Sequence, residues 1–215
     1  AETTSRTRAI YISNPRNGKQ LNSETYGVNA ILKLMGKAED VRRLDLAISV
    51  ASGDVDPTLV NKSLKDLPPV PHVYTSDACN ARVLWAWSRK PDNVKITDEA
   101  TQRILDKATE MGAFYTSKVP IVEAADQRLK IARLAVAAAC CVCSTDETFE
   151  NVIVKPEHVD FVVDFMNDIY KAKSFGYDKL SEQDRITSDT SDSNIAKLRA
   201  MFLTLPLVDA NEMAK

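Results

Sequence analysis

The chain has 215 residues, 44% of them hydrophobic, and a formal net charge of −2. This length allows one large domain or two small ones, and the composition is ordinary for a globular protein. No apolar run approaches the ~20 residues that a membrane-spanning helix needs, and the amino terminus has no signal-peptide pattern. We therefore expect a cytoplasmic protein with no membrane partner. The near-neutral charge excludes a chain that binds polyanions over its whole surface.

The distribution of charges and cysteines indicates which ligands the chain could bind. The first 43 residues hold eight Lys and Arg against four acids, which is a local positive face for a phosphate, a neighbouring subunit or DNA, or else an ordinary solvated surface. Three of the four cysteines lie within Cys140–Cys143, without the paired spacing of a zinc site, and both histidines are far away in sequence. We expect no metal site and buried cysteines in a reducing compartment.

Two apolar runs near the amino terminus, Ala9–Ser13 and Leu44–Ala51, have the length and β-branched content of buried parallel strands. Asn14 follows the first run and precedes Pro15, which ends a strand because it lacks an N–H group. The pattern predicts an amide at the carboxyl end of a strand, where open α/β sheets bind ligands. The alternative is an ordinary Asn-Pro turn.

The segment between the two runs is typical of a helix. Tyr26–Met35 has apolar residues at helical spacing, and Gly36 can end the helix. Arg42 and Arg43 come directly before the second run, where two guanidinium groups suit a phosphate or carboxylate, or form a solvated loop edge. The order strand, helix, strand predicts a parallel βαβ unit.

The segments YISNP and RRLDLAI together resemble the late part of the AAA+ ATPase core of minichromosome maintenance (MCM) helicases. In that family a strand ending in Ala-Asn-Pro carries the sensor 1 asparagine, and a Ser-Arg-Phe-Asp-Leu-Ile segment carries the arginine finger. The resemblance implies that Asn14 is sensor 1 and Arg43 the finger. Because Leu44 stands where the family has Phe and Arg42 where it has Ser, either arginine remains a candidate for the finger.

Other parts of an ATPase core are missing from the sequence. Gly18-Lys19 lacks the preceding glycine of a phosphate loop and is followed by Gln20 in place of Ser or Thr. No apolar strand ends in paired acids for Mg²⁺. We therefore expect a mixed, mainly α chain, in which a partial α/β AAA+ core (sensor 1 strand and arginine-finger strand) is followed by an α-helical lid bundle. Alone, it should have no ATPase activity.

Beyond a proline-rich connector at Leu67–Pro71 the sequence predicts helices. Ser76 can cap a helix over 77–89, and Thr97 can cap another that ends at Gly112. The longest, about Ile121–Cys143, is apolar nearly all round and belongs in the middle of a bundle. We place the core at residues 1–66, the lid at 67–180, and a linker with a terminal helix at 181–215, which could be the start of a winged helix.

The lid of MCM proteins carries a sensor 2 arginine near the start of the helix that resembles IARLAVAA here. The resemblance implies that Arg128 has this role, with Arg133 as the alternative, and an ordinary surface ion pair remains open for both. The segment VIVKPEHVDFVVDFM also resembles the end of MCM lids, where a turn leads into the last helix. Pro156 suits the first position of that helix.

The resemblance implies an ATP-dependent DNA helicase or replication ATPase. Its subunits would form a ring, expected to be hexameric, with ATP and Mg²⁺ at the subunit interfaces, held mainly by residues absent from this chain. DNA would be a partner, which would place the protein in the nucleoid or nucleus. One alternative is a non-enzymatic helical module that binds protein or DNA. Another is a separate subunit that donates its finger to a partner with a phosphate loop.

Overall fold

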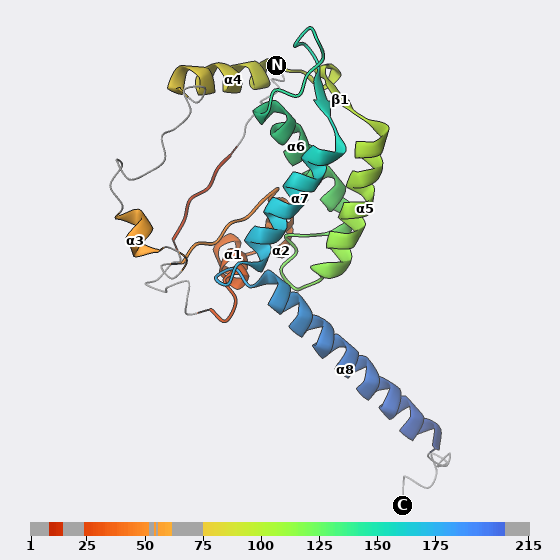
Figure 1. The fold of residues 1–215 in the computed structure, drawn as a ribbon. Coiled ribbons are helices and arrows are strands. Elements are labelled where there is room, and N and C mark those ends of the chain that lie inside the picture. Colours follow the sequence, from red (N-terminus) through yellow and green to blue (C-terminus); the bar gives the residue numbers. More distant parts are fainter. Residues whose placement is uncertain (1–8, 15–23, 52–53, 55, 62–74, 205–215) are drawn as a thin grey trace, which may run out of the picture.

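The computed structural model describes residues 9–14, 24–51, 54, 56–61 and 75–204. These residues are mainly helical, with one small sheet (Figure 1). Along the chain, the elements are α1 (Val28–Met35), α2 (Ala38–Arg42), α3 (Pro57–Val60), α4 (Ser76–Ser88), a 3₁₀ helix (Pro91–Asn93), β1 (Val94–Ile96), α5 (Asp98–Phe114), α6 (Ala124–Cys141), β2 (Val152–Val154), α7 (Pro156–Lys171) and α8 (Tyr177–Thr204).

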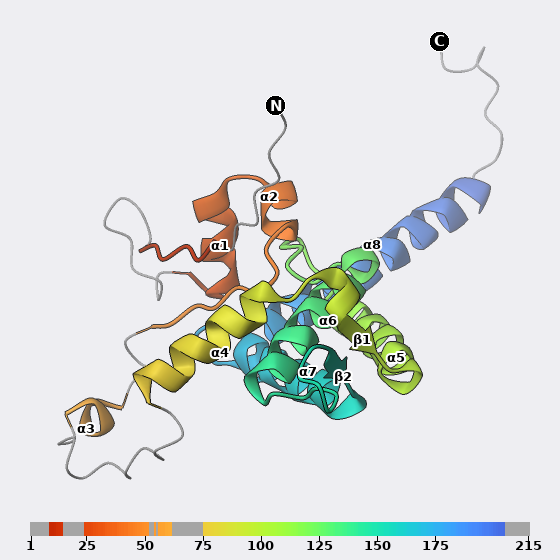
Figure 2. The same ribbon diagram turned by 90° about the horizontal axis from the view of Figure 1, so that it is seen from above.

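Helices α5, α6 and α7 pack on one another and enclose most of the core (Figures 1 and 2). Each contributes an apolar stripe at helical spacing, such as Val159, Val163 and Met166 on α7. Helix α6 contacts both neighbours as well as α4 and β2, so it lies in the middle as its sequence predicts. Burial of these stripes, at ~25 cal/mol per Å² of apolar surface, is the main stabilising contribution.

The ends of these helices differ in detail from the prediction. Thr97 caps α5 as expected, its hydroxyl accepting a hydrogen bond from the Ala100 N–H at 3.2 Å. Helix α4 is capped by Thr75, one residue before the predicted Ser76. Helix α5 continues past Gly112 to Phe114. A Cβ atom at Gly112 would lie 2.7 Å from the Cβ of Ala124 on α6, so this glycine allows the two helices to pack closely.

The sheet consists of β1 and β2, paired in parallel with Val94 opposite Val152. Val152 and Val154 are buried against α6. The ladder continues into a hydrogen bond from the Thr97 N–H to the Val154 carbonyl at 3.1 Å, which joins the starts of α5 and α7. The sequence predicts the apolar run at β2 but not its partner, because β1 is equally short and has a lysine between its two apolar residues.

An aromatic cluster closes the other end of the bundle. Tyr115 stacks on Tyr177 with ring centroids 5.1 Å apart, and Tyr170 stacks on Phe175 at 5.5 Å. The Tyr177 hydroxyl donates to the Val119 carbonyl at 2.7 Å and accepts from the backbone of the same loop. This cluster therefore fixes the loop between α5 and α6 against the start of α8.

The predicted amino-terminal strands are not formed in the described residues. Residues 9–14 and 44–51 are in no sheet, and Ile10 and Ile12 are 91% and 95% exposed. A strand is stable only beside other strands, and the two described strands, β1 and β2, pair with each other and not with these residues. The prediction of a βαβ unit is therefore wrong for this chain by itself.

The helix predicted between those runs is confirmed. Helix α1 ends at Gly36, which has a φ of +81° and donates to the Leu32 carbonyl. An unpredicted short helix, α2, follows it. The buried Val28 and Val41 join this region to the core.

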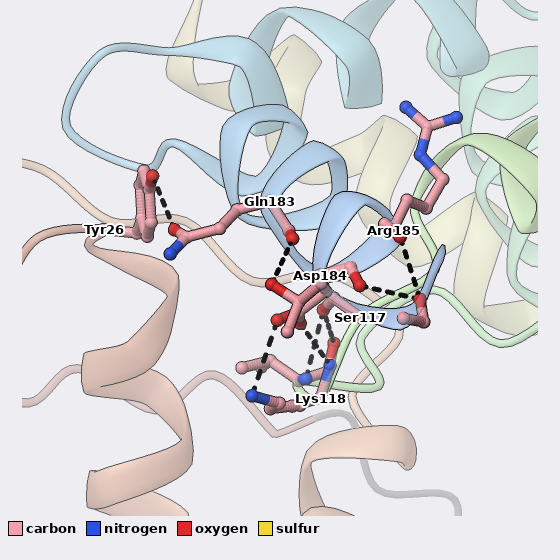
Figure 3. Close-up of polar contacts among 9 residues, drawn as sticks. Tyr26, Ser117, Lys118, Gln183, Asp184 and Arg185 are labelled. Atoms are coloured by element: carbon pink, nitrogen blue, oxygen red, sulfur yellow. Dashed lines mark hydrogen bonds and ion pairs between the residues drawn. The ribbon is translucent and has the colours of Figure 1, made fainter. Parts of the chain in front are cut away.

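Helix α8 runs through the segment predicted to be a linker. It extends away from the bundle as one helix (Figure 1), because residues 177–204 contain neither Gly nor Pro, so polar composition alone does not interrupt it. Its base is held by a hydrogen bond from Tyr26 to Gln183 at 3.0 Å and by contacts of Lys118 with Asp184 (Figure 3). One helix therefore stands where the sequence predicts a linker followed by a separate terminal helix within residues 181–215.

Three further expectations concern the domain boundary, the cysteines and membrane-spanning helices. The predicted boundary at residues 66 and 67 and the proline-rich connector lie outside the described residues. Of the four cysteines only Cys140 is buried, so the expectation that all are core residues is wrong. Among the residues that the structure describes, no helix has the length and apolar character needed to cross a membrane.

Candidate functional site

An open cleft lies between α2, the segment that follows it, and α6. It has a volume of about 450 Å³ and brings together four cationic side chains, three carboxylates and one apolar side chain. The lining residues are Glu39, Arg42, Arg43, Asp45, Asp126, Leu129, Lys130 and Arg133. Residues from the two motifs recognised in the sequence therefore meet at one surface, although they are about 90 positions apart.

Local structure explains how α2 presents its arginines. Arg42 is the last residue of α2 and Arg43 is its C-cap, with φ and ψ still helical. Cations are favoured at this end of a helix because the backbone carbonyls give it a partial negative charge. Val41 is fully buried and anchors the helix to the core. Both guanidinium groups therefore extend from a fixed point into the cleft, at a helix end and not at a strand entrance as predicted.

Two ion pairs cross the cleft in a reciprocal arrangement. The Nε of Arg42 donates to the Oδ2 of Asp126 at 2.5 Å, and the Nη1 of Arg133 donates to the Oδ1 of Asp45 at 2.9 Å. Each side of the cleft thus supplies one arginine and one aspartate. All four side chains are partly exposed, so solvent screens both pairs.

The Arg42–Asp126 pair shifts the titration of both groups. The hydrogen bond from Arg42 is the main reason that the pKa of Asp126 is lowered, and the same bond raises the pKa of Arg42. Both residues therefore remain charged at neutral pH. A phosphate that bound Arg42 would share its guanidinium with this carboxylate, because only the Nε–H group is bonded to Asp126.

Arg43 is held more loosely. Its side chain is 82% exposed, and its nearest carboxylate is Asp40 of the same helix turn, at 3.6 Å. An ion pair of this kind contributes little to stability. Arg43 is therefore the cleft arginine that is most available to a ligand or a neighbouring molecule.

The other two predicted site residues do not line this cleft. Asn14 is exposed at the end of the extended segment 9–14. Arg128 is exposed on α6, whereas Arg133, the alternative for sensor 2, is a lining residue. The structure thus brings together Arg42, Arg43 and Arg133 but neither Asn14 nor Arg128.

Sequence reasoning missed Lys130. This lysine lies on α6 and is only 4% exposed, and its ammonium donates to the Ile121 carbonyl at 2.6 Å. Burial lowers its pKa, while the carboxylates of Asp126 and Asp45 act in the opposite direction. The sequence signal for this residue is that Lys130 directly precedes the buried Ile131, on the side of α6 that faces the core.

The cleft has the chemistry of an anion site. Guanidinium and ammonium groups bind phosphate and carboxylate oxygens, and Arg does so with two parallel hydrogen bonds. The described residues contain no group of three or more His, Cys, Asp or Glu side chains arranged to hold a metal ion. The four cationic side chains therefore suit an anionic group such as a phosphate.

Comparisons of the chain with models of known protein families, with curated proteins and with solved structures found no match.

Proposed function

We propose that this chain is the carboxyl-terminal part of an MCM-type AAA+ ATPase and that its cationic cleft contacts ATP bound by a neighbouring subunit. One observation carries the proposal: Arg42 and Arg43, from the finger motif, line the same cleft as Arg133, from the sensor 2 motif. Two arginines that act on the same phosphate of a neighbouring subunit must lie on one surface of their own chain.

The chemistry suits this arrangement. In phosphoryl transfer the protein mainly positions groups and stabilises the charge that develops on the γ-phosphoryl, and an arginine finger accelerates the reaction by ~10³ to 10⁵. A cleft that is open to solvent can accept a phosphate presented from outside. The cleft has no phosphate loop, so the site would be complete only after assembly.

The geometry favours Arg43 as the finger. Its guanidinium is exposed and loosely paired, whereas Arg42 is held by Asp126 at 2.5 Å. Arg42 then has a positioning role, because its ion pair ties α2 to α6. The same reasoning favours Arg133 over Arg128 as the sensor 2 residue, since only Arg133 reaches the cleft.

The rest of the proposal follows the family resemblance. The bundle of α5, α6 and α7 would be the lid, within residues 67–180, and residues 1–66 would belong to the ATPase core. Asn14 would then contact the γ-phosphate or the attacking water as sensor 1. The assembly would be a ring, expected to be hexameric, that uses ATP and Mg²⁺ to move along DNA.

A second candidate is a non-enzymatic helical module that binds protein or DNA. The reciprocal ion pairs favour it, because Arg42 and Arg133 each already have a carboxylate partner. In that case the ion pairs of the cleft serve only to hold the α2 region against α6. Such a module would be indifferent to the loss of Arg43.

The test begins with the polypeptide encoded upstream of Ala1 in the same reading frame. A phosphate loop and a strand ending in paired acids are expected there. The extended protein should hydrolyse ATP, and Arg43→Ala should reduce kcat by ~10³-fold or more. Arg103→Ala is the matched control, since Arg103 pairs with Asp160 and does not line the cleft.

A mixing experiment tests action between subunits. Protein with Arg43→Ala and protein with an inactivated phosphate loop should each be inactive alone. Mixed together, they should regain part of the activity, because some interfaces then combine an intact loop with an intact finger. No recovery on mixing, or full activity of the Arg43 variant, would contradict the proposal and favour the interaction module.

A further inference from the structure

Lys130 is an unusual residue for an exposed cleft. Its side chain is 4% exposed although the cleft itself is open to solvent. An ammonium group has three N–H donors, and the Lys130 ammonium makes one hydrogen bond, to the Ile121 carbonyl, among the described residues. Its two other N–H groups have no hydrogen-bond partner among the described residues, and Lys130 is one of the residues that line the cleft.

The carboxylates around Lys130 are bonded to other groups. Those that influence it most are Asp126 and Asp45, which also line the cleft, and Glu123 acts on it more weakly. Asp126 accepts a hydrogen bond from Arg42 and Asp45 from Arg133, and no carboxylate is hydrogen-bonded to the Lys130 ammonium among the described residues. A buried ammonium with few hydrogen bonds is costly, and an anion that accepted another hydrogen bond from it would lower this cost.

We propose that Lys130 is a phosphate-binding residue at the inner wall of the cleft, where its free N–H groups donate to a phosphoryl oxygen of a nucleoside triphosphate. This inference rests on the proposed function and adds a binding residue that the sequence motifs do not contain. Lys130 would hold the phosphate at the inner end of the cleft, while Arg43 and Arg133 contact it nearer to solvent.

A purely structural role is the competing explanation. The hydrogen bond to Ile121 fixes the loop before α6, and this contact alone would account for a buried lysine. The two explanations differ in what an anion does. If Lys130 has only a structural role, added phosphate leaves the environment of its ammonium unchanged. If Lys130 binds phosphate, that environment changes.

The first experiment titrates the 215-residue chain with inorganic tripolyphosphate and follows the ε-CH₂ signals of its lysines by NMR. We expect the Lys130 signal to shift with the same midpoint as the overall binding curve measured by calorimetry. Lys107 is an internal control, because it pairs with Glu110 on α5 and does not line the cleft. This measurement needs no substitution, so it holds even if a Lys130 variant fails to fold.

The second experiment compares Lys130→Met with Lys107→Met, after circular dichroism has shown that both are folded. Loss of a charge-assisted contact should raise the Kd of Lys130→Met for tripolyphosphate about tenfold or more and leave Lys107→Met within about twofold. If the Lys130 signal and affinity stay unchanged while Arg43→Ala and Arg133→Ala weaken binding, the inference is wrong and the proposed function stands. If tripolyphosphate does not bind, or binds regardless of all three cations, the inference is wrong, and the proposed function is then decided by the mixing experiment with the extended protein.

Discussion

Arg42 of α2 donates a 2.5 Å hydrogen bond to Asp126 of α6, which ties the segment with the predicted arginine finger to the helix with the predicted sensor 2 arginine. The two residues are 84 positions apart, and the Arg133–Asp45 pair joins the same two segments in the opposite sense. The cleft therefore holds the α2 region on α6 and is also a candidate binding site. An anion that bound there would compete with the carboxylates of the two ion pairs that make this contact.

The two candidate sensor 2 residues make opposite predictions. Arg133→Ala should weaken tripolyphosphate binding by the chain about tenfold, because Arg133 lines the cleft, whereas Arg128→Ala should have little effect. Calorimetric titration of both variants checks this. Removing Arg133 also leaves Asp45 unpaired, and its charge would repel the ligand, so the double variant Asp45→Asn/Arg133→Ala is the necessary control. Weaker binding by Arg128→Ala than by Arg133→Ala would reverse the assignment.

The Arg42–Asp126 pair predicts a pH dependence. Because Arg42 lowers the pKa of Asp126 in the folded protein, the pair contributes stability above the unfolded-state pKa of ~3.9. This contribution is lost as the pH falls through the lower, folded-state pKa. The side-chain carboxyl signal of Asp126, followed by NMR, should titrate below ~3.9 in the wild type and closer to it in Arg42→Ala. The same midpoint in both proteins would show that the pair does not persist in solution.

Two buried tyrosines should respond differently to loss of the hydroxyl. Tyr177→Phe leaves the Val122 N–H without its partner and removes one hydrogen bond to the Val119 carbonyl, which still accepts from Ile121 and Ser117. The free energy of unfolding should fall by ~1 to 3 kcal/mol. The Tyr170 hydroxyl is buried and has no hydrogen-bond partner among the described residues, and burial raises its pKa well above the ordinary value. Tyr170→Phe should therefore be neutral or stabilising.

Urea unfolding at pH 7 measures both changes, and each variant is the other's control. Equal losses of stability would mean that the hydroxyl of Tyr170 has a partner in solution, such as a buried water. An increase in stability for Tyr177→Phe would contradict the hydrogen bonds that fix the loop before α6.

Gly112 offers a test of the packing between α5 and α6. Helix propensity alone predicts that Gly112→Ala stabilises the protein by ~1 kcal/mol and that Ala113→Gly at the exposed next position destabilises it by a similar amount. The Cβ atom that Gly112→Ala adds would, however, lie 2.7 Å from the Cβ of Ala124. Overpacking of this kind typically destabilises a protein by ~1 to 3 kcal/mol. We therefore expect both substitutions to lower the free energy of unfolding, measured in urea. Opposite signs would show that α5 and α6 are less closely packed.

Local signals in the sequence are enough to predict most of the longer helices. The stripe on α7, the threonine cap of α5 and the glycine that ends α1 depend on residues within a few positions of one another. The same signals do not predict the full length of α8, because its polar composition favours a linker although no helix breaker is present. They also could not show that residues 9–14 lack neighbouring strands, since pairing depends on chain segments far away.

By itself, the sequence determined the helical bundle, its central helix and a short set of candidate arginines, because helical period and capping are local properties. Only the tertiary structure decided which candidates meet. It placed Arg42, Arg43 and Arg133 on one cleft, left Arg128 and Asn14 outside it, and brought the buried Lys130 to its inner wall. These outcomes depend on contacts between residues more than 80 positions apart, and such contacts form only when α2 docks on α6.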